Sequence, residues 1–182
     1  MLYYILKFII SVIVILPFYL IIRKPWKRQH KREAALAVFV LFMCGLLILT
    51  LEGDYQRPSV MIARAWNGIR TKGNINLRPF STIIPYFKYF EFDDFMTNIV
   101  GNIVMFMPWG FGLSLFWKKN RSVYKIIVYS LMLTLFIETA QLFIGRKTDI
   151  DDIMLNFLGS CLGALLFYVV KKRTRRLDIY GA

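Results

Sequence analysis

The chain has 182 residues, of which 57% are hydrophobic and 19% are charged, and its formal net charge at pH 7 is +13. A soluble domain usually carries about 25% charged residues, so the composition excludes an ordinary cytosolic enzyme, a disordered chain and a disulfide-stapled small protein. It predicts an all-α, multi-pass protein of the cell membrane, with membrane lipids as partners. An excess of Lys and Arg is typical of the cytoplasmic loops of such proteins, so we infer no nucleic-acid partner from it.

Five apolar stretches are long enough for membrane-spanning helices, which need about 20 residues each. In chain order they are Leu2–Ile22, Ala34–Leu51, Ile99–Trp117, Lys125–Ile144 and Ile153–Val170. Basic residues follow the first stretch rather than precede it, and no small-residue cleavage site is present, so we expect an uncleaved helix. The sequence therefore predicts a polytopic bundle of about five transmembrane helices.

The distribution of charge predicts the orientation of these helices. Fifteen Lys and Arg residues lie in 23–33, in 118–125 and after residue 170, accompanied only by Glu33 and Asp178. Because basic loops stay in the cytoplasm, we expect the N-terminus outside and the C-terminus inside. The chain then divides into an N-terminal transmembrane hairpin with a basic cytoplasmic loop (1–52), an extracytoplasmic loop (53–98), a three-helix core (99–170) and a basic cytoplasmic tail (171–182).

The long outer loop has two recognisable segments. Within Ser59–Arg70, apolar residues recur at helical spacing, which predicts an amphipathic helix on the outer membrane surface. Asn67-Gly68 and Lys72-Gly73-Asn74 are expected to break this helix. The aromatic stretch Phe80–Phe95 either lies at the membrane interface or is simply a packed loop.

Polar residues interrupt the last three apolar stretches. Asn98 and Asn102 are four residues apart, Glu138 and Gln141 are three apart, and Asn156 follows Asp152 by one turn, so each pair shares a helix face. A rise of about 1.5 Å per residue places Glu138 roughly 10 Å below the outer end of its helix. The same rise places Gln141, Asn102 and Asn156 roughly 6 Å below theirs. The sequence thus predicts one polar layer in the outer leaflet.

This layer has two interpretations. A carboxylate inside a membrane is costly and marks a functional site by default, which makes Glu138 and Asp152 candidates for catalysis. Alternatively, the amides join helices by hydrogen bonds, and Arg146 neutralises Glu138. The oxygens of Asp149, Asp151, Asp152 and Glu138 suit Mg²⁺ or Ca²⁺, but the DxDD spacing is unspecific, so we expect neither a metal nor a cofactor. Gly159 and Gly163 form a GxxxG pair typical of helix packing.

These residues, in this order and spacing, resemble the VanZ-like proteins, small polytopic membrane proteins of mainly Gram-positive bacteria. The similar part covers about residues 74–170. It comprises Asn76-Leu77-Arg78-Pro79-Phe80, Asn98 to Asn102, Phe106 to Gly110, Glu138, Gln141, Arg146, Asp149, Asp151-Asp152, Asn156, Gly159 and Gly163. The resemblance implies a role at the cell envelope, and the founding member is associated with low-level resistance to the glycopeptide teicoplanin. It also implies a polar ligand-binding site formed by Arg78, Asn98, Asn102, Glu138, Gln141, Arg146, Asp149, Asp152 and Asn156.

Three functions are consistent with these features. The first is binding of an amphiphilic ligand, such as a lipid, a cell-wall precursor or a glycopeptide. Arg78 and Arg146 would then face its phosphate or carboxylate, and the aromatic segment and surface helix would hold its tail. The second is a membrane enzyme acting on such a ligand, with Glu138 or Asp152 as general base. The third is a small transporter. Five helices do not divide into two matched inverted halves, which argues against this function.

Overall fold

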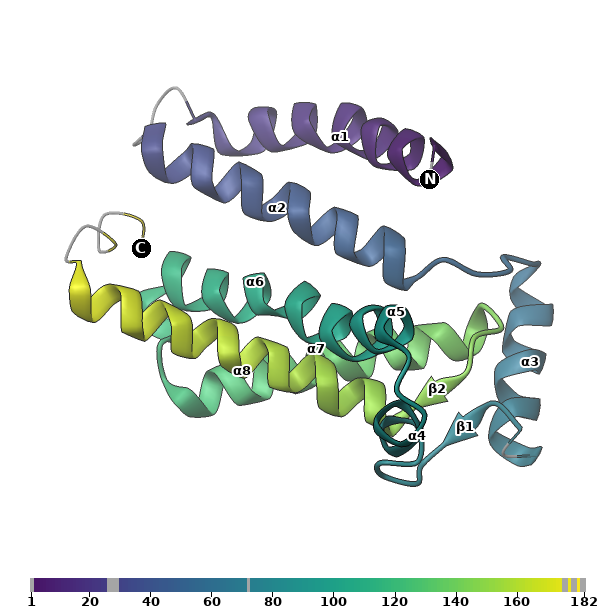
Figure 1. Ribbon diagram of the computed structural model, residues 1–182. Coiled ribbons are helices and arrows are strands. Elements are labelled where there is room, and N and C mark those ends of the chain that lie inside the picture. The colour runs from purple at the N-terminus through teal and green to yellow at the C-terminus, as the bar shows by residue number, and fades with distance from the viewer. Residues whose placement is uncertain (1, 26–29, 72, 175–176, 178–179, 181–182) are drawn as a thin grey trace.

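The protein is a bundle of long helices with a group of short elements at one end (Figure 1). The computed structural model describes residues 2–25, 30–71, 73–174, 177 and 180. Its long helices are α1 (Leu2–Arg23), α2 (His30–Thr50), the continuous helix Phe92–Phe116, α7 (Val123–Phe143) and α8 (Ile150–Arg173). Within the described part, all but α1 are long and apolar enough to cross a membrane, and Val12–Arg23 forms a shorter apolar helix. The predicted all-α polytopic bundle is confirmed.

The third long helix begins at Phe92, earlier than the predicted start at Ile99. It consists of α5 (Phe92–Phe95), one π-helical turn, η2 (Met96–Val100), and α6 (Gly101–Phe116). Asp93 and Asp94 in its first turn favour a helix start because their charges complement the positive end of the helix dipole. The same two charges lower the local hydropathy, which is why hydropathy alone places the start too late.

The closest helix pair is α6 with α8, which cross through glycines. A Cβ atom on Gly159 would collide with the backbone carbonyl of Ile103, and one on Gly163 would collide with that of Met107. Gly110 of α6 lies equally close to the Ser160 carbonyl of α8. The GxxxG pair is therefore a packing motif, as the sequence predicts. The crossing fixes Asn102 of α6 and Asn156 of α8 in one region.

At the other end of the bundle, a buried ion cluster joins α1 to α2. Glu33 is 1% exposed and pairs with Arg23 at 2.7 Å and with Arg32 at 3.2 Å. The hydroxyl of Tyr19 donates a hydrogen bond of 3.0 Å to the same carboxylate. A buried carboxylate needs such partners, so this cluster holds the α1–α2 hairpin together.

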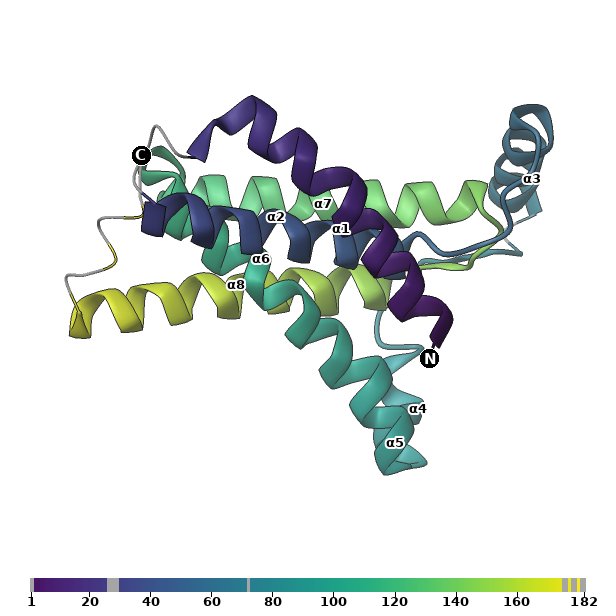
Figure 2. The same cartoon turned by 90° about the horizontal axis from the view of Figure 1, so that it is seen from above.

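The group of shorter elements at one end of the bundle comprises α3 (Pro58–Thr71), β1 (Ile75–Asn76), α4 (Ile83–Lys88) and β2 (Thr148–Asp149). The helix predicted over Ser59–Arg70 is present as α3, but the break predicted at Asn67-Gly68 is wrong. Gly68 is buried, and the position of its Cβ would be in ordinary contact with Leu142 of α7. Packing against α7 therefore supports the helix through a residue of poor helix propensity. Both views show α3 at the end of the bundle, across the long helices (Figures 1 and 2).

A two-residue parallel pairing of β1 with β2 was not expected from the sequence. Ile75 pairs with Thr148, and Asn76 pairs with Asp149. The pairing fastens the segment after α3 to the short connection between α7 and α8 (Figure 1). Because the Asp149 amide also donates to the Glu138 carboxylate, the pairing brings this loop next to the predicted polar layer.

Candidate functional site

Most of the predicted polar residues converge at the end of the bundle that carries β1 and β2. A pocket of about 310 Å³ lies among α2, the third long helix, α7 and α8. Seven of the nine predicted site residues line it: Asn98, Asn102, Glu138, Gln141, Arg146, Asp152 and Asn156. Thr50 and Thr97 add further polar groups, and Leu49, Met105 and Ile137 form its apolar wall. The spacing predicts that polar residues of three helices lie in one layer, and in the structure these residues line a single pocket.

Glu138 is almost completely buried, with 2% exposure, and the connection to α8 fixes its position. Its carboxylate accepts a hydrogen bond of 3.1 Å from the backbone amide of Asp149. The Thr148 hydroxyl donates a second bond of 2.9 Å to the Glu138 backbone carbonyl. Strand β2 therefore holds this part of α7 and presents the carboxylate to the pocket.

Gln141 and Arg146 meet at the end of α2. The Gln141 amide donates to the Thr50 carbonyl at 2.9 Å, and the Arg146 guanidinium donates to the same oxygen at 3.1 Å. The last carbonyls of a helix have no partner within the helix, so both side chains cap α2. No ion pair joins Arg146 to Glu138 in the part of the chain that the structure describes. Arg146 is exposed, so its charge remains available at the mouth of the pocket.

The opposite wall is made of amides. Asn102 donates a bond of 3.2 Å to the Asp152 carboxylate and another of 2.8 Å to the Asn98 carbonyl. Asn156 is 4% exposed, and its side-chain oxygen accepts no hydrogen bond within the described residues. A buried polar atom left without a partner costs about 1–3 kcal/mol. The Asn156 oxygen is therefore positioned to accept a hydrogen bond from a ligand.

Asp149 lies beside the pocket rather than in it. Its carboxylate accepts bonds from the Asn76 amide at 3.0 Å and the Thr82 hydroxyl at 2.6 Å. It also caps the N-terminus of α8 by accepting from the Asp151 amide at 3.0 Å. Asp149 therefore joins the 76–82 segment to the start of α8.

Asp151 has a similar structural role. It is fully buried and accepts hydrogen bonds from the backbone amides of Phe80, Thr82 and Ile83 at 2.6, 2.7 and 3.1 Å. Together, Asp149 and Asp151 with these loop partners form what we call the loop latch. Asn76 lies in the stretch that resembles the VanZ-like proteins, but its bond to Asp149 could not be inferred from the sequence.

Arg78 is the other predicted residue outside the pocket. Its side chain is exposed, and its backbone amide donates to the Asn76 side chain at 3.2 Å. Phe80, two residues after Arg78, has a φ of +63°. This left-handed backbone region is uncommon for residues other than glycine. The stretch 76–80 therefore forms a tight turn that directs the Phe80 amide at Asp151.

A smaller cavity of about 120 Å³ adjoins the polar pocket and shares Asn98 and Asp152 with it. Tyr86 of α4 lines this cavity. Burial raises the pKa of the Tyr86 hydroxyl, and the carboxylates of Asp94, Asp152 and Asp149 raise it further. The hydroxyl therefore stays protonated at neutral pH and adds a hydrogen-bond donor next to Asp152.

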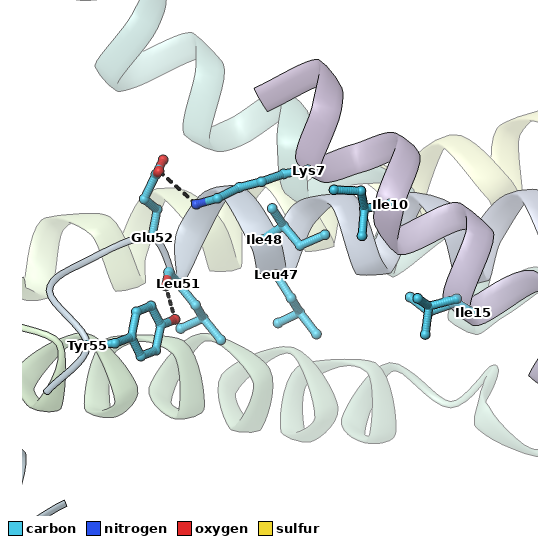
Figure 3. A pocket seen from close by; sticks show the side chains of 9 residues that line it. Lys7, Ile10, Ile15, Leu47, Ile48, Leu51, Glu52 and Tyr55 are labelled. Atoms are coloured by element: carbon cyan, nitrogen blue, oxygen red, sulfur yellow. Dashed lines mark hydrogen bonds and ion pairs between the residues drawn. The ribbon is translucent and has the colours of Figure 1, made fainter. Parts of the chain in front are cut away.

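A third cavity, of about 570 Å³, lies between α1 and α2 and is almost entirely apolar. Figure 3 shows Ile10, Ile15, Leu47 and Ile48 around it, with Lys7 reaching Glu52 at one end. The Lys7 ammonium lies 3.0 Å from the Glu52 carboxylate. This cavity shares no lining residue with the polar pocket.

Among the described residues, no group of three or more His, Cys, Asp or Glu side chains is placed to hold a metal ion. The acidic residues at the start of α8 have different roles. Asp149 and Asp151 accept bonds from the outer loop, whereas Asp152 accepts from Asn102 and lines the pocket. In the DxDD pattern, Asp149 and Asp151 therefore have structural roles, whereas Asp152 belongs to the polar pocket.

The fold and the pocket define a polytopic membrane protein with a polar site at one end of its helix bundle. The family model for VanZ/LLP1 matches residues 36–171. The chain therefore belongs to the VanZ/LLP1 family. Comparisons with curated proteins and with solved structures gave no match.

Proposed function

We propose that the polar pocket is an outward-facing site, in the cell membrane, for an amphiphilic ligand of the cell envelope. The observation that carries the proposal is the convergence of seven predicted residues on one pocket in which the Asn156 oxygen is buried without a partner. A buried polar atom without a partner needs an explanation, and a ligand that donates a hydrogen bond to it is one. The volume of about 310 Å³ lies at the lower end of the range for small-molecule sites.

The charges in the pocket indicate what kind of head group fits. Arg146 at the mouth suits a phosphate or carboxylate, which a guanidinium binds well. Glu138 and Asp152 present carboxylates to the same space, and these suit an ammonium or amide donor. A head group that carries both an anion and an amine, as in phosphatidylethanolamine or an amino-acid-bearing wall precursor, matches this arrangement.

The same pocket supports a second candidate function, catalysis on such a ligand. Glu138 and Asp152 come from different helices and line one cavity, which is an arrangement that general acid–base chemistry uses. Family membership supports a contribution to teicoplanin resistance as a further proposal, because a protein that binds or alters envelope lipids changes the surface that the glycopeptide meets.

The test uses purified protein in nanodiscs of phosphatidylcholine with labelled phosphatidylethanolamine as the probe. We expect saturable binding that falls in Arg146→Ala and Glu138→Gln. Arg78→Ala is the matched control, because Arg78 is exposed and lies outside the pocket. Equal binding by all four proteins would overturn the assignment of the pocket. Chromatography of the recovered lipid, with and without EDTA, separates binding from catalysis.

A further inference from the structure

The structure assigns the groove between α2 and α6 to the acyl chain of the lipid whose head group occupies the polar pocket. This inference rests on the proposed function and extends it, because it names a lipid tail as the second half of the ligand and gives its path. The groove has a volume of about 410 Å³ and is lined by apolar residues of α2, from Val38 to Leu49, and by Met105 of α6.

The groove continues directly from the polar pocket. Leu49 and Met105 line both cavities, one from each helix. Leu49 directly precedes Thr50, whose carbonyl accepts from Gln141 and Arg146. A molecule with its head among these polar groups therefore meets an apolar surface as soon as it extends toward the other end of the bundle.

The dimensions of the groove suit a lipid tail. Val38 and Leu49 are eleven residues apart on α2, which corresponds to about 16 Å along the helix. The hydrocarbon core of a bilayer is about 30 Å thick, so one leaflet contributes about 15 Å. The groove is thus about as long as one leaflet is deep, and the polar pocket lies at its outer end.

The groove is also open to the side. Val38 is 68% exposed, and Leu49 is 45% exposed. Figure 2 shows α6 crossing α2 at an angle and diverging from it toward α5. A lipid can therefore enter sideways from the outer leaflet without its tail leaving an apolar environment. The α1–α2 cavity offers no such route, since it shares no residue with the polar pocket.

The experiment uses phosphatidylethanolamine with a diazirine in the middle of one acyl chain, in phosphatidylcholine nanodiscs, and maps the cross-links by mass spectrometry. We expect cross-links to Phe42, Leu46 or Met105 that an excess of unlabelled phosphatidylethanolamine removes. Gly45→Phe places a ring in the groove and should abolish these cross-links. Ile48→Phe is the matched control, because it adds the same ring on the α1–α2 side of the same helix and should leave them unchanged.

A second variant guards against misfolding of Gly45→Phe. Val38 lies at the inner end of the groove and is largely exposed, so the Val38→Phe variant should fold normally. It should remove only cross-links from a lipid whose diazirine lies near the end of the acyl chain. Competed cross-links that fall on the 80–95 segment or in the α1–α2 cavity would overturn the tail path and leave the head-group site intact. The absence of any competed cross-link would overturn both proposals.

Discussion

Glu138 and Asp149 are joined by a hydrogen bond of 3.1 Å from the Asp149 amide to the Glu138 carboxylate. The side chain of Asp149, in turn, binds Asn76 and Thr82 of the outer loop. Asp149 therefore contacts both the pocket carboxylate and the 76–82 segment. Thr148 makes a second connection, because it pairs with Ile75 and its hydroxyl donates to the Glu138 carbonyl, so strand β2 links the loop to Glu138.

The first prediction separates a binding role of Glu138 from a packing role. Glu138→Gln retains an oxygen that can accept from the Asp149 amide, and a neutral amide costs less to bury than a carboxylate. We expect the variant to insert normally and to melt at the same or a higher temperature in detergent, while phosphatidylethanolamine binding falls. Binding and melting temperature are measured on the same preparation.

Asp152→Asn is the companion variant, because Asp152 also lines the pocket and accepts a bond from Asn102. It should show the same loss of binding with little loss of stability. If both variants bind the lipid as the unmodified protein does, the polar layer serves only to join the helices and the pocket binds no ligand.

The second prediction concerns Arg146. Because Arg146 and Gln141 share the Thr50 carbonyl, removing one donor leaves the other in place. Arg146→Ala combined with Gln141→Leu should therefore cost about 1 kcal/mol more than the sum of the single changes. The measurement is a double-mutant cycle on unfolding in detergent. Arg146→Ala combined with Glu138→Gln serves as the comparison, and a larger coupling in that pair would restore a direct Arg146–Glu138 interaction.

The third prediction concerns the loop latch. Asp151→Ala removes the acceptor of three backbone amides, and we expect a loss of about 2–4 kcal/mol in stability, since each unsatisfied amide is costly. Thermal unfolding in detergent measures the loss. Asp93→Ala is the control, because Asp93 is exposed and should shift the melting temperature little. Limited proteolysis should cut the 76–83 loop faster in the Asp151 variant alone.

The fourth prediction concerns orientation in the membrane. A reporter fused after Ala182 should be active in the cytoplasm, and one inserted beside Asn74 should be active outside, because the excess of Lys and Arg falls on the other side from the 53–98 segment. Activity of both reporters on the same side would contradict the five-helix topology, and activity of the Asn74 reporter in the cytoplasm would place the pocket on the cytoplasmic face.

Hydropathy and spacing predicted the helices and the polar layer because both depend on residues close together in sequence. Glu138 and Gln141 share a helix face whatever the tertiary arrangement of the helices. Apolar stretches long enough to span a membrane form helices there. The roles of Asp149 and Asp151 could not be predicted, since their partners are about 70 residues away and most are backbone amides. The resemblance to the VanZ-like proteins implied Arg78 as a site residue, whereas in the structure Arg78 is exposed and does not line the pocket.

The pairing of β1 with β2 also constrains the order in which the protein is assembled. Asn76 is synthesised 73 residues before its partner Asp149, so the outer loop must wait until α6, α7 and most of the connection to α8 have been made. Closing so long a segment is slow compared with forming a single helix. The polar pocket draws on residues from α2 to α8, so it cannot be completed until α8 has been synthesised and packed.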